Sequence, residues 1–465
     1  MNRSRRYTLP VFALLTLALV YLVAWAAGPG GPGTAADSSA PRTAPVTAVT
    51  RDCPPSGPGG GQAHVAEFAA PSPAFSAGQA GRAPAQTGVR SSGNTGGAGG
   101  SATEVTATGT MARGFESEQS GDDGTGLVTC QHPGSDMWFV GTGTKTGGSA
   151  TWLYLTNTGA MPASTNVTVL TDTGVRSAQD NQVTVPPHRY VGVNIASQAG
   201  ASQELAVHVQ TSSGQVAADV WQDGGSGGAW LPAATAPATA MVVPGVTAAG
   251  GAPKLLVAVP GEQDAQVRVT ALTAQGQTRP LGTGSQDATG GATSSFSLGS
   301  LGSSAAALVV SSNVPITASV QDQGDGVGAF TAATPPVTGQ GVVAGNPSGG
   351  GSTAGLALSA PAARVRAAIT VLPSSSSGRT LPAPQQTVTV QSRHTAQVKV
   401  TPPKGARGPF AIVVTPLAGS GPLYAARTVS SGGLSGKPRA LLPVVSVYSR
   451  VRLPAASENY GAVQP

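Results

Sequence analysis

Short segments of alternating hydrophobic and polar residues fill most of this chain, and they recur in three copies about a hundred residues apart. Each copy begins with an apolar segment that ends in a glycine: Trp138–Gly141, Val242–Gly245 and Val342–Gly345. Alternation then follows, for example at Val167–Leu170, as expected for strands with one face on a core and one face in water. Turn residues separate these segments, so the pattern predicts roughly seven strands per copy.

A repeat of this length fits a complete β-sandwich better than a solenoid unit. We predict an all-β fold with three tandem immunoglobulin-like β-sandwiches after an N-terminal membrane helix and a flexible linker. A β-propeller is the alternative, because a hundred residues could also form two four-stranded blades. The predicted parts are 1–27 (signal anchor or signal peptide), 28–60 (flexible linker), 61–134 (N-terminal segment tied by a disulfide), 135–230, 240–330 and 340–452 (sandwich repeats) and 453–465 (tail).

Between these parts, glycine- and proline-rich stretches predict connections. We expect linkers between the repeats at Gly224–Pro237 and Thr331–Thr338, and another flexible stretch at Ser91–Ala102. Between the N-terminal linker and that stretch, His64–Phe68 has a strand pattern, and we expect it to add to the first sandwich.

The N-terminus predicts export. Three arginines lie within the first six residues, and the uncharged apolar run Leu9–Ala27 follows them. The run is long for a signal-peptide core and slightly short for a membrane-spanning helix, so cleavage near Ala26 and retention as a single anchor both remain open. In either case the remainder is predicted to be extracytoplasmic, anchored in the cell membrane by one N-terminal helix or secreted after cleavage.

Cys53 and Cys130 are the only cysteines. In an exported chain an even count predicts a disulfide, with two free thiols as the alternative. The bridge would close a loop that the chain-entropy model values at about 4 kcal/mol of stability. Two thiols without Cys-x-x-Cys spacing do not predict a metal site.

Charge gives weaker information. The net charge is +6, and no basic stripe with interleaved aromatic residues occurs, which disfavours nucleic acid as a partner. Cations gather toward the C-terminus, where they either attract anionic envelope polymers and lipid headgroups or form an ordinary solvated surface. These cations are Arg427, Lys437, Arg439, Arg450 and Arg452.

Catalytic motifs are missing from the sequence, so we predict no enzyme, no cofactor and no metal ion. It contains no His-Glu-x-x-His or P-loop motif. His188 and His394 occupy similar places in their copies, which indicates a turn position shared by the fold.

Tryptophan is the remaining chemical clue, because the first copy contains four and the other two copies contain none. We expect Trp138 and Trp152 to fill the core of the first sandwich. Trp221 and Trp230 lie at a domain end and in an expected linker, and they are the candidates for ligand contact.

The stretch from Cys130 through Trp138–Gly141 to Trp152–Asn157, together with Gln215–Asp219 and Trp230–Pro232, resembles an uncharacterised family of exported actinobacterial proteins, domain of unknown function 5719. The resemblance covers most of the chain from about Cys53 onward. It implies an envelope-associated protein whose genes accompany those of glycosyltransferases, and it implies no catalytic residue.

The expected function is therefore a non-enzymatic, exported interaction or scaffold role at the cell envelope, as an accessory to envelope polysaccharide assembly. Its partners would be the membrane, through the N-terminal helix, and an envelope glycan or envelope protein. The alternative is a protein that binds or processes carbohydrate through the first repeat, with Trp221 and Trp230 in contact with the glycan.

Overall fold

The computed structural model of the 465-residue chain describes residues 42–55, 64–69, 87–94, 102–120, 127–143, 150–176, 182–223, 228–247, 251–299, 301, 305–322, 328–347, 352–373, 384–402, 410–431 and 438–453. The chain divides into two units. One contains the two chain ends, Met1–Pro45 and Arg450–Pro465, and the other contains Val46–Ser449.

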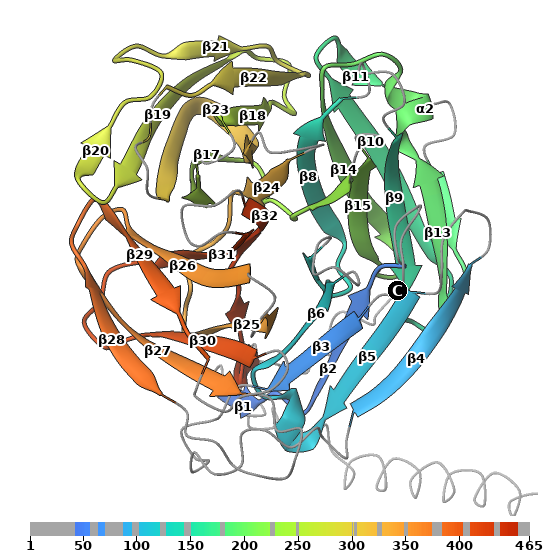
Figure 1. Cartoon of the computed structure of the whole chain (residues 1–465). Coiled ribbons are helices and arrows are strands. Elements are labelled where there is room, and N and C mark those ends of the chain that lie inside the picture. Colours follow the sequence, from blue (N-terminus) through green and yellow to red (C-terminus); the bar gives the residue numbers. More distant parts are fainter. Residues whose placement is uncertain are drawn as a thin grey trace, which may run out of the picture. The chain divides into compact units, whose positions relative to one another are not determined.

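Strands dominate the larger unit, as the alternating pattern predicted (Figure 1). Before the first repeat, the N-terminal segment contains β2 (Ala48–Cys53), β3 (His64–Ala69), β4 (Thr87–Asn94), β5 (Ala102–Thr108), the short 3-10 helix η1 (Gly109–Ala112), β6 (Phe115–Ser120) and β7 (Val128–Thr129).

The first repeat adds one short helix to its strands. Asn194 caps this helix, because its side-chain oxygen accepts a hydrogen bond from the backbone N–H of Ser197. The elements are β8 (Asp136–Thr142), β9 (Ala150–Asn157), β10 (Ala163–Thr171), β11 (Gly174–Arg176), β12 (Gln182–Val185), β13 (Arg189–Asn194), α2 (Ile195–Ala199), β14 (Glu204–Ser213), β15 (Ala217–Asp223) and β16 (Gly228–Leu231).

The second and third repeats follow the same order of elements. The second contains β17 (Ala238–Val246), β18 (Lys254–Ala258), β19 (Ala265–Thr273), β20 (Gly276–Thr278), β21 (Gln286–Ala288), β22 (Thr293–Ser297), β23 (Ala306–Asp322) and β24 (Ala329–Ala332). The third contains β25 (Gln340–Asn346), β26 (Ser352–Ala360), β27 (Val365–Pro373), β28 (Gln385–Val390), β29 (His394–Val400), β30 (Phe410–Pro416), β31 (Tyr424–Ser431), β32 (Pro438–Pro443) and β33 (Ser446–Val447).

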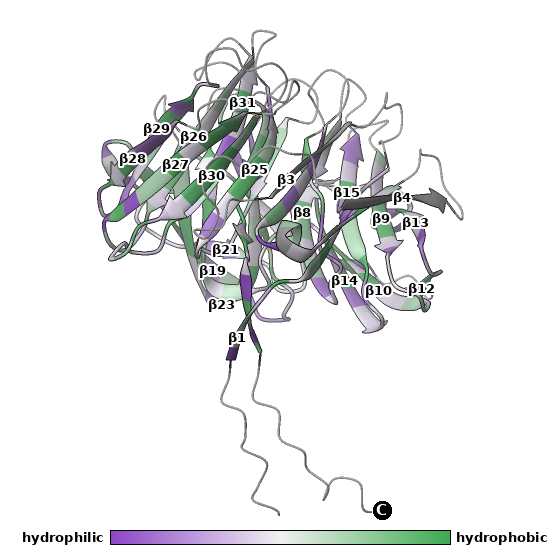
Figure 2. Cartoon of the chain, turned by 90° about the horizontal axis from the view of Figure 1, so that it is seen from below, coloured by the Kyte–Doolittle hydropathy of each residue, from purple (hydrophilic) through white to green (hydrophobic). Residues whose placement is uncertain are grey.

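Strand pairing repeats from copy to copy. One series runs β11-β10-β14-β8, β20-β19-β23-β17 and β28-β27-β30-β25, and the other runs β16-β15-β9-β13, β24-β23-β18-β22 and β32-β31-β26-β29. The long strand β23 contributes its first half to one series and its second half to the other. Side chains from both series meet in one hydrophobic cluster per repeat. Figure 2 shows the alternation of hydropathy along these strands.

Two expected connections differ from the prediction. The predicted linkers at Gly224–Pro237 and Thr331–Thr338 overlap strands β16 and β24, which pair with β15 and β23. The reason is burial: Leu231 and Phe330 enter the core of the first repeat, so these segments complete a sheet. Likewise β4 covers part of the expected flexible stretch Ser91–Ala102.

The N-terminal segment also departs from expectation. Strand β3 pairs with β6 in a separate three-stranded sheet with β7, and does not add to the first repeat. Instead β4, in a parallel pair with β13, extends the β16-β15-β9-β13 sheet by β4, β5 and β2.

Contacts within the larger unit form a closed cycle. The hydroxyl of Ser319 in the second repeat donates to the carbonyl of Val140 in the first at 2.7 Å. Between the second and third repeats, a side chain at Gly245 would overlap Ala426. The third repeat contacts β6, and the N-terminal segment in turn shares a sheet with the first repeat.

The repeat-opening glycines differ in their backbone. In the second and third repeats the register shifts between Val243 and Val246 and between Val343 and Asn346, and Gly245 and Gly345 have φ of 75° and 66°. These are β-bulges in which glycine accommodates the left-handed conformation. In the first repeat the strand runs through Gly141 without a shift.

The sequence predicts that His188 and His394 share a turn position, but in the structure the two turns match with an offset of one residue. His188 has φ of 51°, and the matching left-handed residue is Arg393 with φ of 64°, so His394 corresponds to Arg189.

The smaller unit is a two-stranded ribbon in which β1 (Arg42–Pro45) pairs antiparallel with β34 (Arg450–Leu453). No helix among the described residues is long and apolar enough to cross a membrane, and the predicted span Leu9–Ala27 lies outside them.

Candidate functional site

Aromatic side chains gather on one face of the first repeat. Leu153 and Leu155 of β9 enter the repeat's core, so the alternate residues Trp152 and Tyr154 lie on the opposite face of the sheet. The neighbouring strands add residues in register on that face. We call this set the aromatic face: Trp152, Tyr154, Tyr190, Trp221 and Trp230.

The rings of this face contact one another. Trp221 and Trp230 are directly paired across β15 and β16, and their ring centroids lie 5.1 Å apart in an edge-to-face arrangement. Tyr154 lies 5.9 Å from Trp230 and 6.2 Å from Tyr190. Gly228 packs against Trp221, since any Cβ there would overlap the indole ring.

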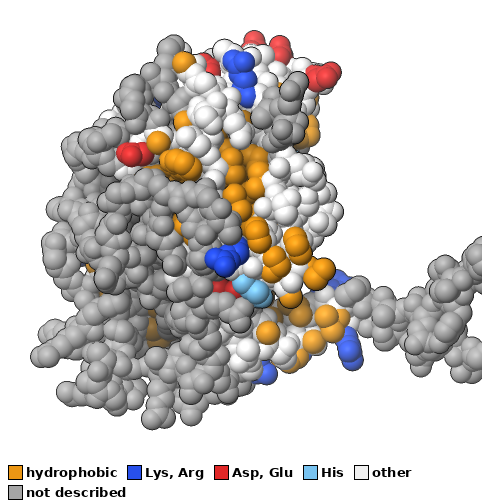
Figure 3. All heavy atoms as spheres, turned by 90° about the vertical axis from the view of Figure 1, so that its right-hand side faces the viewer, with side chains coloured by type: hydrophobic (Ala, Val, Ile, Leu, Met, Phe, Trp, Pro, Cys, Tyr) orange, Lys and Arg blue, Asp and Glu red, His pale blue; other side chains and the backbone are white. Residues whose placement is uncertain are grey.

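Exposure divides the aromatic face. Trp230 is 6% exposed and Tyr154 and Tyr190 are buried, with Ala102 and Val128 of the N-terminal segment in the same cluster. Trp152 and Trp221 are only half-buried. Figure 3 shows the side of the molecule that includes β13, where hydrophobic side chains form a band. The accessible part of the aromatic face is therefore formed by Trp152 and Trp221.

Two unpartnered polar atoms lie on the same face. The indole nitrogen of Trp221 and the hydroxyl of Tyr154 are buried and have no hydrogen-bond partner among the described residues. Burial raises the pKa of Tyr154 to about 12, so its hydroxyl stays protonated. Both groups are hydrogen-bond donors, but neither atom is accessible to a ligand in this structure.

A buried acidic pair lies beside the aromatic face. Asp219 is directly opposite Tyr154 across β15 and β9. Asp52 of β2 interacts with Asp219 and with Thr156 of β9. Burial raises the pKa of both carboxyl groups well above the usual range, and the Asp219 pKa is raised further by Asp52. Burial therefore disfavours the charged form of both carboxyl groups.

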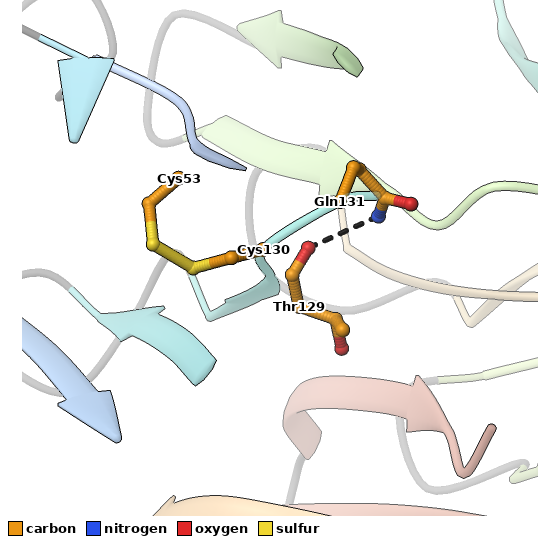
Figure 4. Close-up of a disulfide and its surroundings, with 4 residues drawn as sticks. All are labelled: Cys53, Thr129, Cys130 and Gln131. Carbon is orange, nitrogen blue, oxygen red and sulfur yellow. Dashed lines mark hydrogen bonds between the residues drawn. A yellow bond between two sulfur atoms is a disulfide. The ribbon is translucent and has the colours of Figure 1, made fainter. Parts of the chain in front are cut away.

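The disulfide adjoins that pair, because Cys53 follows Asp52 directly. Cys53 and Cys130 are bonded and fully buried, with a Cα–Cα distance of 4.3 Å (Figure 4). Backbone hydrogen bonds between Asp52 and Gln131 of 2.9 and 2.8 Å run beside it. In the same view the Gln131 amide donates to the carbonyl of Thr129 at 3.0 Å. The predicted disulfide is confirmed.

Two buried ion pairs extend from the N-terminal segment. A guanidinium nitrogen of Arg51 lies 2.7 Å from a carboxylate oxygen of Glu116. In the second pair, a guanidinium nitrogen of Arg427 in the third repeat lies 2.8 Å from a carboxylate oxygen of Glu118. Burial raises the pKa of Glu116 to about 8 and that of Glu118 to about 7, although the arginines oppose the rise. Desolvation thus outweighs the attraction within each pair.

The Glu118–Arg427 pair is built into the bulge of β25. The backbone N–H of Ala344 donates to Glu118 at 3.1 Å, and Arg427 donates to the carbonyl of Ala344 at 2.7 Å. Asn346 lies 3.5 Å from the same guanidinium nitrogen. The register shift that exposes both backbone groups of Ala344 therefore supplies the polar lining for this pair.

The sequence predicted two pairs of site residues, and the structure brings each pair together. Cys53 is bonded to Cys130, and Trp221 packs against Trp230. Trp230 lies in a strand and not in a linker, and its ring is buried. Of the two expected core tryptophans, Trp138 is buried against His208 with ring centroids 3.9 Å apart, whereas Trp152 faces away from the core.

Sequence reasoning missed Tyr154, Tyr190 and Trp152 as members of one face. Period-two alternation could have found Trp152 and Tyr154, because both alternate with the core residues Leu153 and Leu155. It also missed the buried charges Asp52 and Arg427, which no local pattern indicates.

Comparison with known proteins identifies the family. The model of the Family of unknown function (DUF5719) matches residues 91–401. This chain belongs to that family. The matched region contains the aromatic face, Glu118 and Cys130, and it ends before Arg427. No curated protein and no solved structure matches the chain significantly. Within the described residues, no group of three or more His, Cys, Asp or Glu side chains could hold a metal ion.

Proposed function

We propose that this DUF5719 protein is a non-enzymatic, exported interaction or scaffold protein of the cell envelope. The closed cycle of contacts carries the proposal, because it fixes the N-terminal segment and three repeats in one body. Such a body holds its surfaces at set positions, which is what a scaffold requires. The buried acidic and basic groups serve this cohesion, since Arg51, Glu116, Glu118 and Arg427 pair with one another.

In this proposal each repeat is an immunoglobulin-like sandwich. Support comes from the two series of paired strands in each repeat and from their common hydrophobic cluster. A propeller blade would instead present a single sheet packed face to face against the next blade.

The disulfide supports export, because such bonds persist in oxidising compartments. The experiment is fractionation of cells that express the full chain, followed by non-reducing electrophoresis. We expect a disulfide-bonded protein in the membrane fraction, or a shortened one in the medium if cleavage occurs near Ala26. Reduced protein in the cytosol would contradict the proposal.

Glycan binding through the aromatic face is the second candidate function. The half-buried rings of Trp152 and Trp221 favour it, because such rings can stack on the apolar faces of sugars. We expect Trp152→Ala to reduce retention of the protein on cell-wall polysaccharide about tenfold, equivalent to about 1.4 kcal/mol.

Trp138→Phe is the matched control, since Trp138 lies in the same repeat but is buried on another strand. It should leave retention unchanged. Equal retention of wild type, Trp152→Ala and Trp138→Phe would remove the glycan candidate and leave the scaffold proposal in place. Trp230→Ala is unsuitable, because it would remove a buried ring and disturb the fold.

A further inference from the structure

The ribbon formed by the two chain ends has two different faces. Residues directly opposite in an antiparallel pair project on the same side. Arg452 is opposite Thr43 and Arg450 is opposite Pro45, so both arginines share one face. The other face carries Arg42 and three apolar residues, namely Ala44, Val451 and Leu453.

This ribbon is basic and open to solvent. Arg42, Arg450 and Arg452 are exposed, and none of its eight residues is acidic. The Arg450 guanidinium donates to the carbonyl of Thr43 at 3.2 Å, which holds the side chain along the ribbon. The predicted C-terminal cluster of cations is thereby divided: Arg427 is buried in the protein interior, whereas Arg450 and Arg452 are exposed. The side chains of its other two members, Lys437 and Arg439, lie outside the described part of the chain.

The apolar face of the ribbon is also open to solvent, since Val451 is 41% exposed. Arginine close to exposed aliphatic side chains is typical of a membrane–water interface.

The sequence places the ribbon near the predicted anchor. Residues 28–41 separate the apolar run Leu9–Ala27 from Arg42, and at full extension they would reach about 50 Å. This step depends on the proposed export and anchoring. A retained anchor would keep the ribbon at high local concentration beside the outer surface of the membrane.

We propose that the β1–β34 ribbon docks on the membrane surface by binding anionic phospholipid headgroups through Arg450 and Arg452, which share one face. Each arginine near an anionic surface contributes about 1 kcal/mol, so loss of two should weaken docking by about 10- to 30-fold. The attraction falls with salt, because ions screen it over about one Debye length.

Hydrogen–deuterium exchange on the full chain tests this proposal. The chain is reconstituted in nanodiscs of phosphatidylcholine alone or of phosphatidylcholine with phosphatidylglycerol. We expect exchange in residues 42–45 and 450–453 to slow about tenfold in the anionic discs, as docking excludes solvent from the ribbon. High salt should remove the difference.

Three variants separate charge from structure. Arg450→Gln with Arg452→Gln should lose the slowing, and Arg450→Lys with Arg452→Lys should keep it, because only charge is needed. Arg364→Gln with Arg366→Gln is the matched control, since these exposed arginines of the third repeat have the same spacing. That control should behave as wild type.

Equal exchange in both discs would overturn membrane docking. Slowing that requires polyphosphate in solution, and not the anionic lipid, would overturn it in favour of a soluble anionic polymer. A chain that fails to insert is tested by flotation with vesicles of the same two compositions. Failure to insert then concerns only the anchor, whereas loss of binding to the anionic vesicles or discs concerns the ribbon.

Discussion

In the second repeat Val320 of β23 faces Leu255 of β18, whereas in the third repeat Arg427 of β31 faces Leu356 of β26. In the first repeat the same register pairs Val220 with Leu153. Both valines lie in the hydrophobic cores of their repeats, and Arg427 is likewise fully buried. The third repeat therefore has a guanidinium at a position where its relatives in the chain have a valine.

The difference shows that the third repeat is completed by a part of the chain outside it. In the second repeat the backbone carbonyl of Pro244 at the bulge has its hydrogen-bond donor within the same repeat, because the Thr331 hydroxyl donates to it at 2.7 Å. The third repeat needs Glu118 of the N-terminal segment to pair with Arg427. A buried pair of this kind adds little net stability, because desolvation offsets the attraction, but removal of one partner leaves an uncompensated buried charge.

The largest expected effect comes from Glu118→Ala. Its loss leaves the Arg427 guanidinium buried without a counter-ion, which should lower the free energy of unfolding by about 3–5 kcal/mol. Urea denaturation of the variant and of wild type measures this loss.

The double variant Glu118→Leu with Arg427→Val restores the valine of the other repeats. It should recover at least about 2 kcal/mol relative to Glu118→Ala, because no charge then remains buried. A loss below about 1 kcal/mol in Glu118→Ala would mean that the pair is not needed to hold the third repeat.

A smaller effect distinguishes the third repeat from the second, because the stability of the third repeat should depend on pH. The folded protein holds the Glu118 proton more tightly than the unfolded chain, since burial raises its pKa from 4.5 to about 7. The stability contributed by this proton is complete below about pH 4.5 and is lost as the pH rises through about 7.

Urea midpoints measured across this pH range should therefore fall for wild type and fall less for Glu118→Gln. The conservative variant keeps hydrogen-bonding atoms but cannot ionise. Identical slopes for the two proteins would show that Glu118 titrates in its ordinary range.

Val320→Ala in the second repeat is expected to cost about 2 kcal/mol, from lost burial and the cavity left behind. Its cost should be the same at all pH values in that range, because no titratable group takes part. Denaturation at two pH values measures it, and a strong pH dependence would remove the contrast between the second and third repeats.

The smallest effect concerns the bulge on which the Arg427 pair depends. Gly345→Ala forces a side chain into a left-handed residue and should cost about 1 kcal/mol. Gly174→Ala is a useful reference, because Gly174 has φ of 111° in a hairpin with open space around it, away from the bulges. A much larger loss at Gly345 than at Gly174 would show that the bulge also positions the ion pair, which thermal unfolding of both variants can reveal.

The strands and their recurrence were predictable, because alternation and turn residues are local signals. Val167–Leu170 became part of β10, and the repeat-opening segments became β8, β17 and β25. The sequence predicts linkers at β16 and β24, since four residues among glycines give too little alternation to recognise a strand. Their place is set by the burial of Leu231 and Phe330 in a core formed by other strands.

The candidate site was predictable only in part. The cysteine count and the expected export were enough to predict the disulfide. Trp221 and Trp230 were singled out because tryptophan is concentrated in one repeat, but their mutual contact depends on the register of β15 with β16. Arg427 was assigned to a surface of cations, because its burial depends on Glu118, which lies about 300 residues earlier in the chain.

That separation has a consequence for biogenesis. Glu118 is synthesised early, and its counter-ion Arg427 is added only after the second repeat and most of the third. At about 5–20 residues per second, the N-terminal segment must wait tens of seconds for its last contact. A chain truncated before β31 would keep an unmatched carboxylate and an unfinished cycle of contacts. Closure of the cycle of contacts therefore requires that the chain has been synthesised through β31.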